Sequence, residues 1–88
     1  MIFVAKDKQT GLYSNAIHDW FLDNQIWIKE TNHSVEEVID ELSQSNESSC
    51  LWTDNVRDAD IWNQYNIDRW KKYLPNVEFV TVTITVEK

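Results

Sequence analysis

The sequence has very few of the residues that mark disulfide-bonded, metal-binding or sharply turned proteins. Its 88 residues include one cysteine, one glycine and one proline. A single cysteine excludes an internal disulfide and any zinc site built from several cysteines. A lone glycine excludes a glycine-rich phosphate-binding loop. Nothing in this composition indicates an oxidising compartment, and we expect neither a metal nor a cofactor.

Long apolar runs and basic residues are also scarce. The apolar stretch Met1–Ala5 is interrupted at once by Lys6, so it is too short for a signal peptide or a membrane span. We therefore expect a cytoplasmic protein without membrane contact. Eight Lys and Arg against fifteen Asp and Glu give a net charge of −7. Such a field repels nucleic-acid backbones and attracts basic protein surfaces.

Aromatic residues, in contrast, are plentiful. The chain holds five tryptophans, three tyrosines and three phenylalanines, and 42% of its residues are hydrophobic. This content is far above that of a disordered chain, and the length suits one domain over residues 1–88.

The C-terminal stretch predicts a strand. Every residue from Phe79 to Val86 is β-branched or aromatic, and aliphatic residues alternate with threonines. We expect the aliphatic face to be buried and to comprise Val80, Val82, Ile84 and Val86. Phe79 and the threonines are then left on a face with no obvious cover.

A helix is predicted from Ser34 to Leu42. Ser34 and Glu37 match a capping box, in which side chains satisfy the first backbone N–H groups. The apolar residues recur at helical spacing and are Val35, Val38, Ile39 and Leu42. We expect this stripe to pack on the aliphatic face of the C-terminal strand.

Two further strands are predicted near the N-terminus. Met1–Ala5 is apolar throughout and predicts a central strand. Leu12–Tyr13 predicts a short partner, across a turn in which Gly11 can take a positive φ. The segment Ser14–Ile28 predicts a short helix followed by a strand at Ile26–Lys29, and a hairpin over residues 20–28 is the alternative.

The second half of the chain predicts one short strand and two helices. The strand is Cys50–Thr53. Two apolar stripes follow, and on one regular helix their directions would differ by more than about 100°. We therefore expect a break near Asn66, with Asn66 capping the second helix; the stripes are Ile61, Trp62 and Tyr65, then Ile67, Trp70 and Leu74.

This order of elements, without a βαβ repeat, predicts an α+β fold. We expect a small, mainly antiparallel sheet of three to five strands, with two or three helices packed on one face.

The acidic residues are concentrated in the middle of the chain. Ten acids lie between Glu30 and Asp68, against the single base Arg57. Trp and Tyr are the residue types most enriched at binding hot spots. We expect the partner-binding residues to be Glu36, Glu37, Asp40, Glu41, Glu47, Asp54, Asp58 and Asp60, with the exposed aromatics Trp52, Trp62 and Tyr65.

Catalytic chemistry has little support. His18 and His33 each have acidic neighbours, but their spacing matches no ligand or catalytic motif. We interpret both as surface residues and Cys50 as a buried or half-buried structural thiol. We therefore expect no enzyme and no catalytic residues.

These features favour a small protein that binds a basic protein, such as a nuclease or a nucleic-acid-binding complex, as a monomer or weak dimer. In size, charge and aromatic content the chain resembles small acidic inhibitors from phages and bacteria, such as anti-CRISPR, anti-restriction and nuclease-immunity proteins. This resemblance implies inhibition by mimicry of nucleic-acid charge. The alternatives are a structural or regulatory domain whose acidity confers solubility, and a small hydrolase using His18 or His33.

Overall fold

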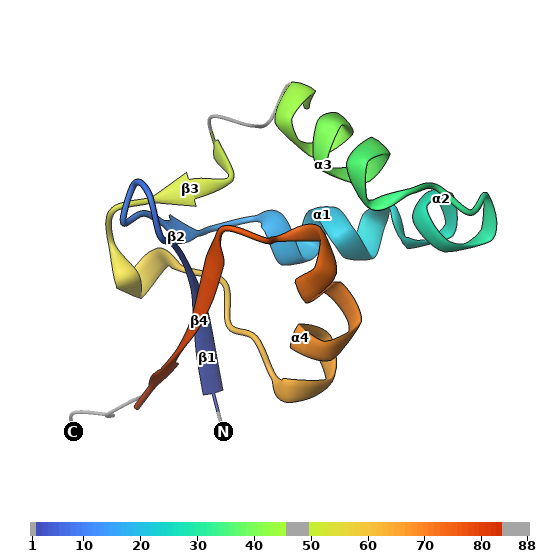
Figure 1. Cartoon of the computed structure of the whole chain (residues 1–88). Coiled ribbons are helices and arrows are strands. Elements are labelled where there is room, and N and C mark those ends of the chain that lie inside the picture. Colours follow the sequence, from blue (N-terminus) through green and yellow to red (C-terminus); the bar gives the residue numbers. More distant parts are fainter. Residues whose placement is uncertain (1, 46–49, 84–88) are drawn as a thin grey trace.

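A computed structural model describes residues 2–45 and 50–83 and confirms the α+β fold (Figure 1). Four antiparallel strands form one sheet in the order β3-β2-β1-β4. They are β1 (Ile2–Asp7), β2 (Tyr13–Ser14), β3 (Trp52–Thr53) and β4 (Val77–Val82). The described residues also contain α1 (Ile17–Asp23), α2 (Gln25–Glu30), α3 (Val35–Gln44) and α4 (Gln64–Trp70), with 3-10 turns η2 (Val56–Asp58) and η3 (Lys71–Tyr73).

The N-terminal strand lies inside the sheet, as its apolar sequence predicts. β1 pairs with β2 on one side and with β4 along its whole length on the other, from Ile2 opposite Val82 to Asp7 opposite Val77. Gly11 has a φ of 74° in the turn that leads to β2. That left-handed conformation is the one glycine adopts without steric cost.

The face of β4 that packs on the core is the opposite of the one predicted. Phe79 lies opposite the fully buried Ala5 and contacts the core edge-on to Trp62, with ring centroids 5.4 Å apart. Val80, on the other face, is 37% exposed. Large aromatic surface decides the orientation here, because burying one phenylalanine outweighs burying one valine. Ile84 and Val86 lie outside the described residues.

A helix replaces the strand predicted at residues 26–29. α1 ends at its C-cap residue Asn24, whose backbone N–H and side-chain amide both donate to the Trp20 carbonyl oxygen, at 3.1 and 2.8 Å. α2 then starts at the next residue and buries Ile28 while leaving Ile26 66% exposed. A strand would place both isoleucines on one face. The hairpin alternative is wrong for the same reason.

The first of the two helices predicted here, with Ile61, Trp62 and Tyr65 on one face, is not formed, so the expected break near Asn66 is absent. Trp62 is extended and pairs with Phe3 of β1 through two backbone hydrogen bonds of 2.9 and 2.8 Å. α4 begins only after Asn63, whose side chain accepts the N–H of Asn66 at 2.8 Å. Asn66 is therefore inside the helix and does not cap it. The face that carries Ile67 and Trp70 is buried, as its spacing predicts.

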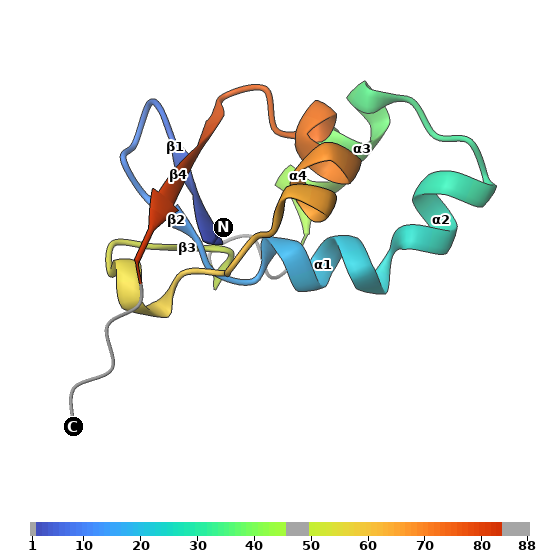
Figure 2. The same cartoon turned by 90° about the horizontal axis from the view of Figure 1, so that it is seen from below.

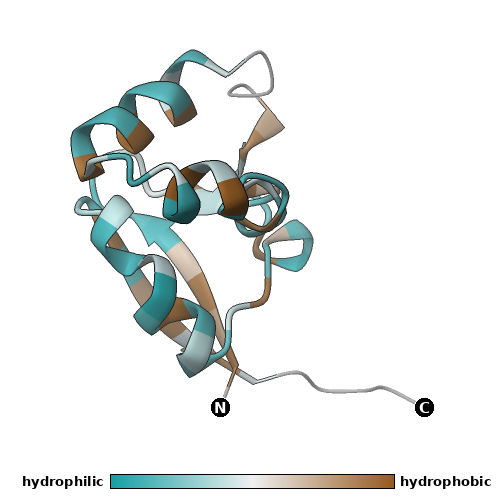
Figure 3. Ribbon diagram, turned by 90° about the vertical axis from the view of Figure 1, so that its right-hand side faces the viewer, coloured by the Kyte–Doolittle hydropathy of each residue, from teal (hydrophilic) through white to brown (hydrophobic). Residues whose placement is uncertain are grey.

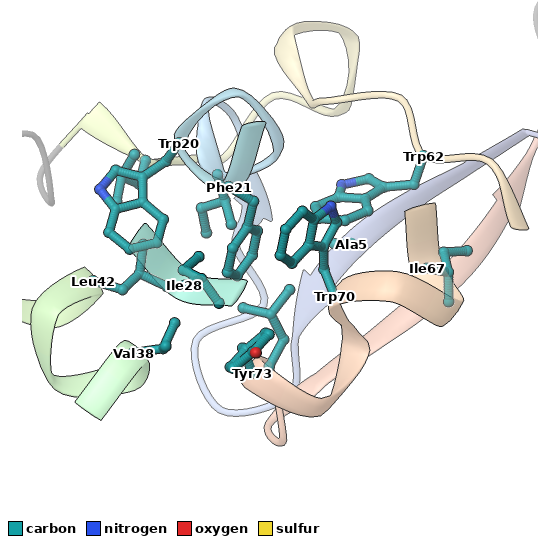
Figure 4. Close-up of a cluster of buried hydrophobic side chains, with 13 residues drawn as sticks. Ala5, Trp20, Phe21, Ile28, Val38, Leu42, Trp62, Ile67, Trp70 and Tyr73 are labelled. Carbon is teal, nitrogen blue, oxygen red and sulfur yellow. The ribbon is translucent and has the colours of Figure 1, made fainter. Parts of the chain in front are cut away.

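The core lies between the helices and one face of the sheet (Figure 4). At its centre Phe21 of α1 stacks on Trp70 of α4, with centroids 5.0 Å apart and planes at 8°. Val38 and Leu42 of α3 lie beside Ile28 at one end of this cluster (Figure 4). The expectation that α3 packs on β4 is therefore wrong, since α3 covers the other helices (Figure 1).

Candidate partner-binding surface

Helix α3 begins where the capping box predicts and presents two unlike faces. The Ser34 hydroxyl oxygen accepts the Glu37 backbone N–H at 3.2 Å, and it donates to the Glu37 carboxylate at 3.2 Å. Val38 and Leu42 are buried on the inner side. Figure 3 shows the same division, with the hydrophobic residues of α3 turned toward the other helices.

The outer side of α3 carries only negative charge. Its sequence, VEEVIDELSQ, contains no Lys or Arg. Four carboxylates are exposed on it, from Glu36, Glu37, Asp40 and Glu41. We call these four residues the α3 acidic face. Glu36 and Glu37 lie in the first turn, where the positive end of the helix dipole stabilises acids, so two members of this face also favour the start of the helix.

One member of this face is held more firmly than the others. The His33 imidazole and then the Ser34 hydroxyl form hydrogen bonds that lower the pKa of Glu37 from its ordinary 4.5. Glu37 therefore has a fixed carboxylate, whereas its neighbours on α3 point into solvent.

Of the other four predicted acids, the three that the structure describes do not extend this face. Asp54 and Asp58 are exposed, but they lie around η2, away from α3 in both views (Figures 1 and 2). Asp60 is half-buried and hydrogen-bonded to the protein itself. Glu47 lies outside the described residues. The structure thus brings together four of the eight predicted acids.

The predicted aromatic contacts have different exposures. Trp62 is completely buried, so the expectation that it is exposed is wrong. Trp52 is half-buried in β3, and Tyr65 is 69% exposed on α4. Sequence reasoning missed Ile26, because assigning residues 26–29 to a strand hid its outward position. A helical reading of residues 25–30 would have placed Ile26 and Ile28 about 200° apart.

A buried polar cluster links distant parts of the chain. The hydroxyl of Ser14, which is fully buried, donates to an Asp60 carboxylate oxygen at 3.3 Å and accepts from Trp62 Nε1 at 3.2 Å. The same Asp60 oxygen accepts the His18 backbone N–H at 3.1 Å. Burial raises the pKa of Asp60 from its ordinary 3.8 despite these hydrogen bonds.

This cluster has the residue types of a hydrolytic site but a different arrangement. The His18 ring lies against Trp62, with centroids 4.9 Å apart, and its Nε2 is buried with no hydrogen-bond partner among the described residues. His33 contacts Trp27 and Glu37 instead. Each histidine therefore contacts a different carboxylate and a different indole. A nucleophilic serine needs a base such as an imidazole beside its hydroxyl. The Ser14 hydroxyl instead contacts the Asp60 carboxylate and the Trp62 indole.

A pair of cations covers the outer side of Trp70. Lys29 Nζ lies 5.4 Å and Arg69 Cζ 4.6 Å from the centroid of this indole. Phe21 occupies its opposite face. Arg69 also donates to the Gln25 side chain at 2.6 Å. These contacts fasten α4 to α2.

No three His, Cys, Asp or Glu side chains in ranges 2–45 and 50–83 are placed to hold a metal ion. None of the helices within these ranges is long and apolar enough to cross a membrane. Cys50 is exposed, so the expectation of a buried or half-buried thiol is wrong. The adjacent Leu51 fills the core position instead.

Comparison of the chain with protein-family models, with curated proteins and with solved structures gives no match. The described surface carries one acidic helix face on α3, a pair of basic residues against Trp70, and a few exposed aromatic and aliphatic side chains.

Proposed function

We propose that this protein is a small, non-enzymatic inhibitor that binds a basic, nucleic-acid-handling protein by imitating nucleic-acid charge. The α3 acidic face is the contact surface, and one observation carries this assignment. Four exposed carboxylates lie on a single helix that has no basic residue and is anchored to the core through Val38 and Leu42. A rigid row of acids is the form of charge that a nucleic-acid-binding cleft accepts.

The charge density on α3 supports this reading. Residues 36–41 span about 7.5 Å of helix axis at 1.5 Å per residue. Four negative charges within that length are of the same order as the one charge per about 1.7 Å of duplex DNA. Carboxylates would take the places of phosphates, and long-range attraction would speed the encounter.

Aromatic side chains would add contact area away from the helix. Tyr65 is the most exposed large aromatic residue, and tyrosine is frequent at binding hot spots. α4 begins on the opposite side of the molecule from α3 (Figure 1). We therefore assign the first, electrostatic contact to α3 alone, and Tyr65 and Trp52 to a partner large enough to extend around the protein.

The test is a comparison of two charge-neutralised variants with three substitutions each. The first is Glu36→Gln, Asp40→Asn and Glu41→Gln, which keeps Glu37 because that residue belongs to the helix cap. The matched control is Asp54→Asn, Asp58→Asn and Glu78→Gln, three exposed acids elsewhere. Both variants change the net charge by the same amount, so a non-specific effect of charge alters both equally.

Affinity capture at low salt, followed by mass spectrometry, supplies the partner. We expect a basic nucleic-acid-binding protein that is released by added duplex DNA and by salt, because exposed ion pairs are screened. The α3 variant should lose it and the control should retain it. Capture that survives in the α3 variant contradicts the proposal. If no basic partner is recovered and the α3 variant is merely less soluble, the acidity serves solubility in a structural or regulatory domain.

A further inference from the structure

His33 connects α2 to α3 through two contacts of its imidazole ring. The ring stacks on Trp27 of α2, with centroids 4.0 Å apart and planes at 28°. Its Nδ1 lies 2.6 Å from Glu37 Oε2 in the first turn of α3. The His33 side chain is 23% exposed. The imidazole is thus held between an aromatic face on one helix and a carboxylate on the next.

The short connection that carries His33 is fixed at several points. The His33 N–H donates to the Ile28 carbonyl oxygen at 3.3 Å, and the Thr31 hydroxyl donates to the Trp27 carbonyl oxygen. Asn32 has a φ of 58°, the left-handed conformation that asparagine adopts more readily than most residues. These contacts set the position of His33 independently of its ring, so the ring contacts can change without unfolding the turn.

The charged groups around this ring are few. Glu37 on α3 is the only acid within 4.0 Å of the His33 ring nitrogens among the described residues, so Glu30 on α2 and Glu36 on α3 are farther away. Lys29, the base on α2, extends over the Trp70 ring. Trp27 contributes a π face and no titratable group. The proton on His33 therefore acts on one carboxylate and one indole.

We propose that Trp27, His33 and Glu37 form a proton-operated latch, which fixes α2 against the start of α3 when His33 is protonated. An imidazolium forms a charge-assisted hydrogen bond with the Glu37 carboxylate and a cation–π contact with Trp27. A neutral ring keeps a hydrogen bond to the ionised carboxylate and a stacking contact, but it loses the ion pair and the cation–π contact. The latch is therefore tighter in mildly acidic solution than at alkaline pH, where histidine is uncharged.

The latch also has a lower limit in pH. Hydrogen bonds from His33 and Ser34 lower the pKa of Glu37, so its carboxylate stays ionised where an ordinary glutamate takes up a proton. Further acidification neutralises Glu37 and removes the ion pair. The predicted response is bell-shaped, with its maximum in mildly acidic solution. General pH-dependent unfolding also gives a maximum of stability, commonly between about pH 5 and 8, so the latch is identified by the loss of its response in variants that lack His33 or Glu37.

Amide hydrogen exchange in the free protein tests this proposal. We would measure the first-turn amides of α3 at about pH 4, 5, 6 and 8, corrected for intrinsic exchange rates. Protection should be about two- to fivefold greater near pH 5 than at pH 8, the range that a surface ion pair supports. His33→Gln and Glu37→Gln should abolish the pH response, whereas His18→Gln, which removes the other histidine, should retain it. A response that persists in His33→Gln overturns the latch.

Tryptophan fluorescence gives a second, independent reading of the same contact. A protonated imidazole quenches an indole that it touches, so emission should fall between pH 8 and pH 5. Trp27→Phe and His33→Gln should remove this part of the change. An unchanged pH response in Trp27→Phe contradicts the proposal. Both experiments use the protein without a partner, so their outcome is separate from that of the capture experiment on the α3 acidic face.

Discussion

The Asp60 carboxylate accepts the backbone N–H of His18, 42 residues earlier in the chain, at 3.1 Å. This contact supplies the N-terminal cap of α1, because Ala16, the local N-cap residue, has no side chain that can accept a hydrogen bond. A backbone bond from the Asp60 N–H to the Ser14 carbonyl oxygen, at 2.8 Å, holds the two segments in place. A helix start is thus completed by a residue from the opposite half of the sequence.

Removing this long-range cap should destabilise the protein. We expect Asp60→Ala to lower the free energy of unfolding by about 1–2 kcal/mol, the usual cost of losing a helix N-cap. Asp60→Asn should cost less, since an amide oxygen can still accept the His18 N–H. Urea denaturation measures both, and Asp58→Ala, at an exposed acid, is the control and should stay within about 0.5 kcal/mol of the wild type. Equal effects at positions 58 and 60 would contradict the capping role.

The two carboxylates with shifted pKa values should affect pH-dependent stability in opposite directions. Burial raises the pKa of Asp60, so its proton-linked contribution to stability is complete below pH 3.8 and is lost as the pH rises through the raised value. The Glu37 pKa is lowered, so its contribution is present above pH 4.5 and is lost as the pH falls through the lowered value.

Urea denaturation across this pH range separates the two groups. As the pH rises from about 3.5 to about 7, the stability of Asp60→Asn relative to wild type should improve. Over the same range, Glu37→Gln should become less stable relative to wild type. Parallel pH profiles of wild type and Asp60→Asn would show that burial of this carboxylate has no energetic consequence.

Features that depend on residues close together in the sequence are predictable from it, whereas features that depend on distant residues are not. The Ser34 cap and the inner stripe of α3 depend on residues within one helix, and both are found where the sequence places them. The cap of α1 depends on Asp60, and no pattern near His18 indicates it. The sequence alone therefore groups Asp60 with the solvent-facing acids. The α3 acidic face was predictable, whereas the separation of Asp54 and Asp58 from it depends on the path of the chain.

Removing the buried Ser14 hydroxyl should destabilise the protein more than the small size of this group suggests. Ser14→Ala removes the acceptor for Trp62 Nε1 and the donor to Asp60. An unpaired polar group in the interior costs about 1–3 kcal/mol, so we expect destabilisation in that range. Ser43→Ala, which removes an exposed hydroxyl bonded to the Ile39 carbonyl oxygen, is the matched control and should have little effect. Thermal unfolding of both variants gives the comparison.

Side-chain size explains the inverted β4 strand. Alternation in this stretch identifies two faces but not which of them is inside. The sequence has aliphatic residues on one face, yet the core needs an aromatic partner for Trp62, and Phe79 provides it at 5.4 Å. Trp62 itself is placed by its backbone pairing with Phe3, a contact between distant segments. The face of β4 therefore follows from where Trp62 lies, which local sequence does not specify.

Substitutions on the two faces of β4 test this orientation directly. Phe79→Ala should lower the free energy of unfolding by about 2–4 kcal/mol, because it removes a large ring from the contact with Trp62. Val80→Ala should cost about 1 kcal/mol or less, since Val80 is 37% exposed. Val80→Thr tests the same face with a side chain of similar shape and should also be mild. Urea denaturation with a constant m-value gives the ranking, and a larger loss at Val80 than at Phe79 would mean that β4 presents its aliphatic face to the core.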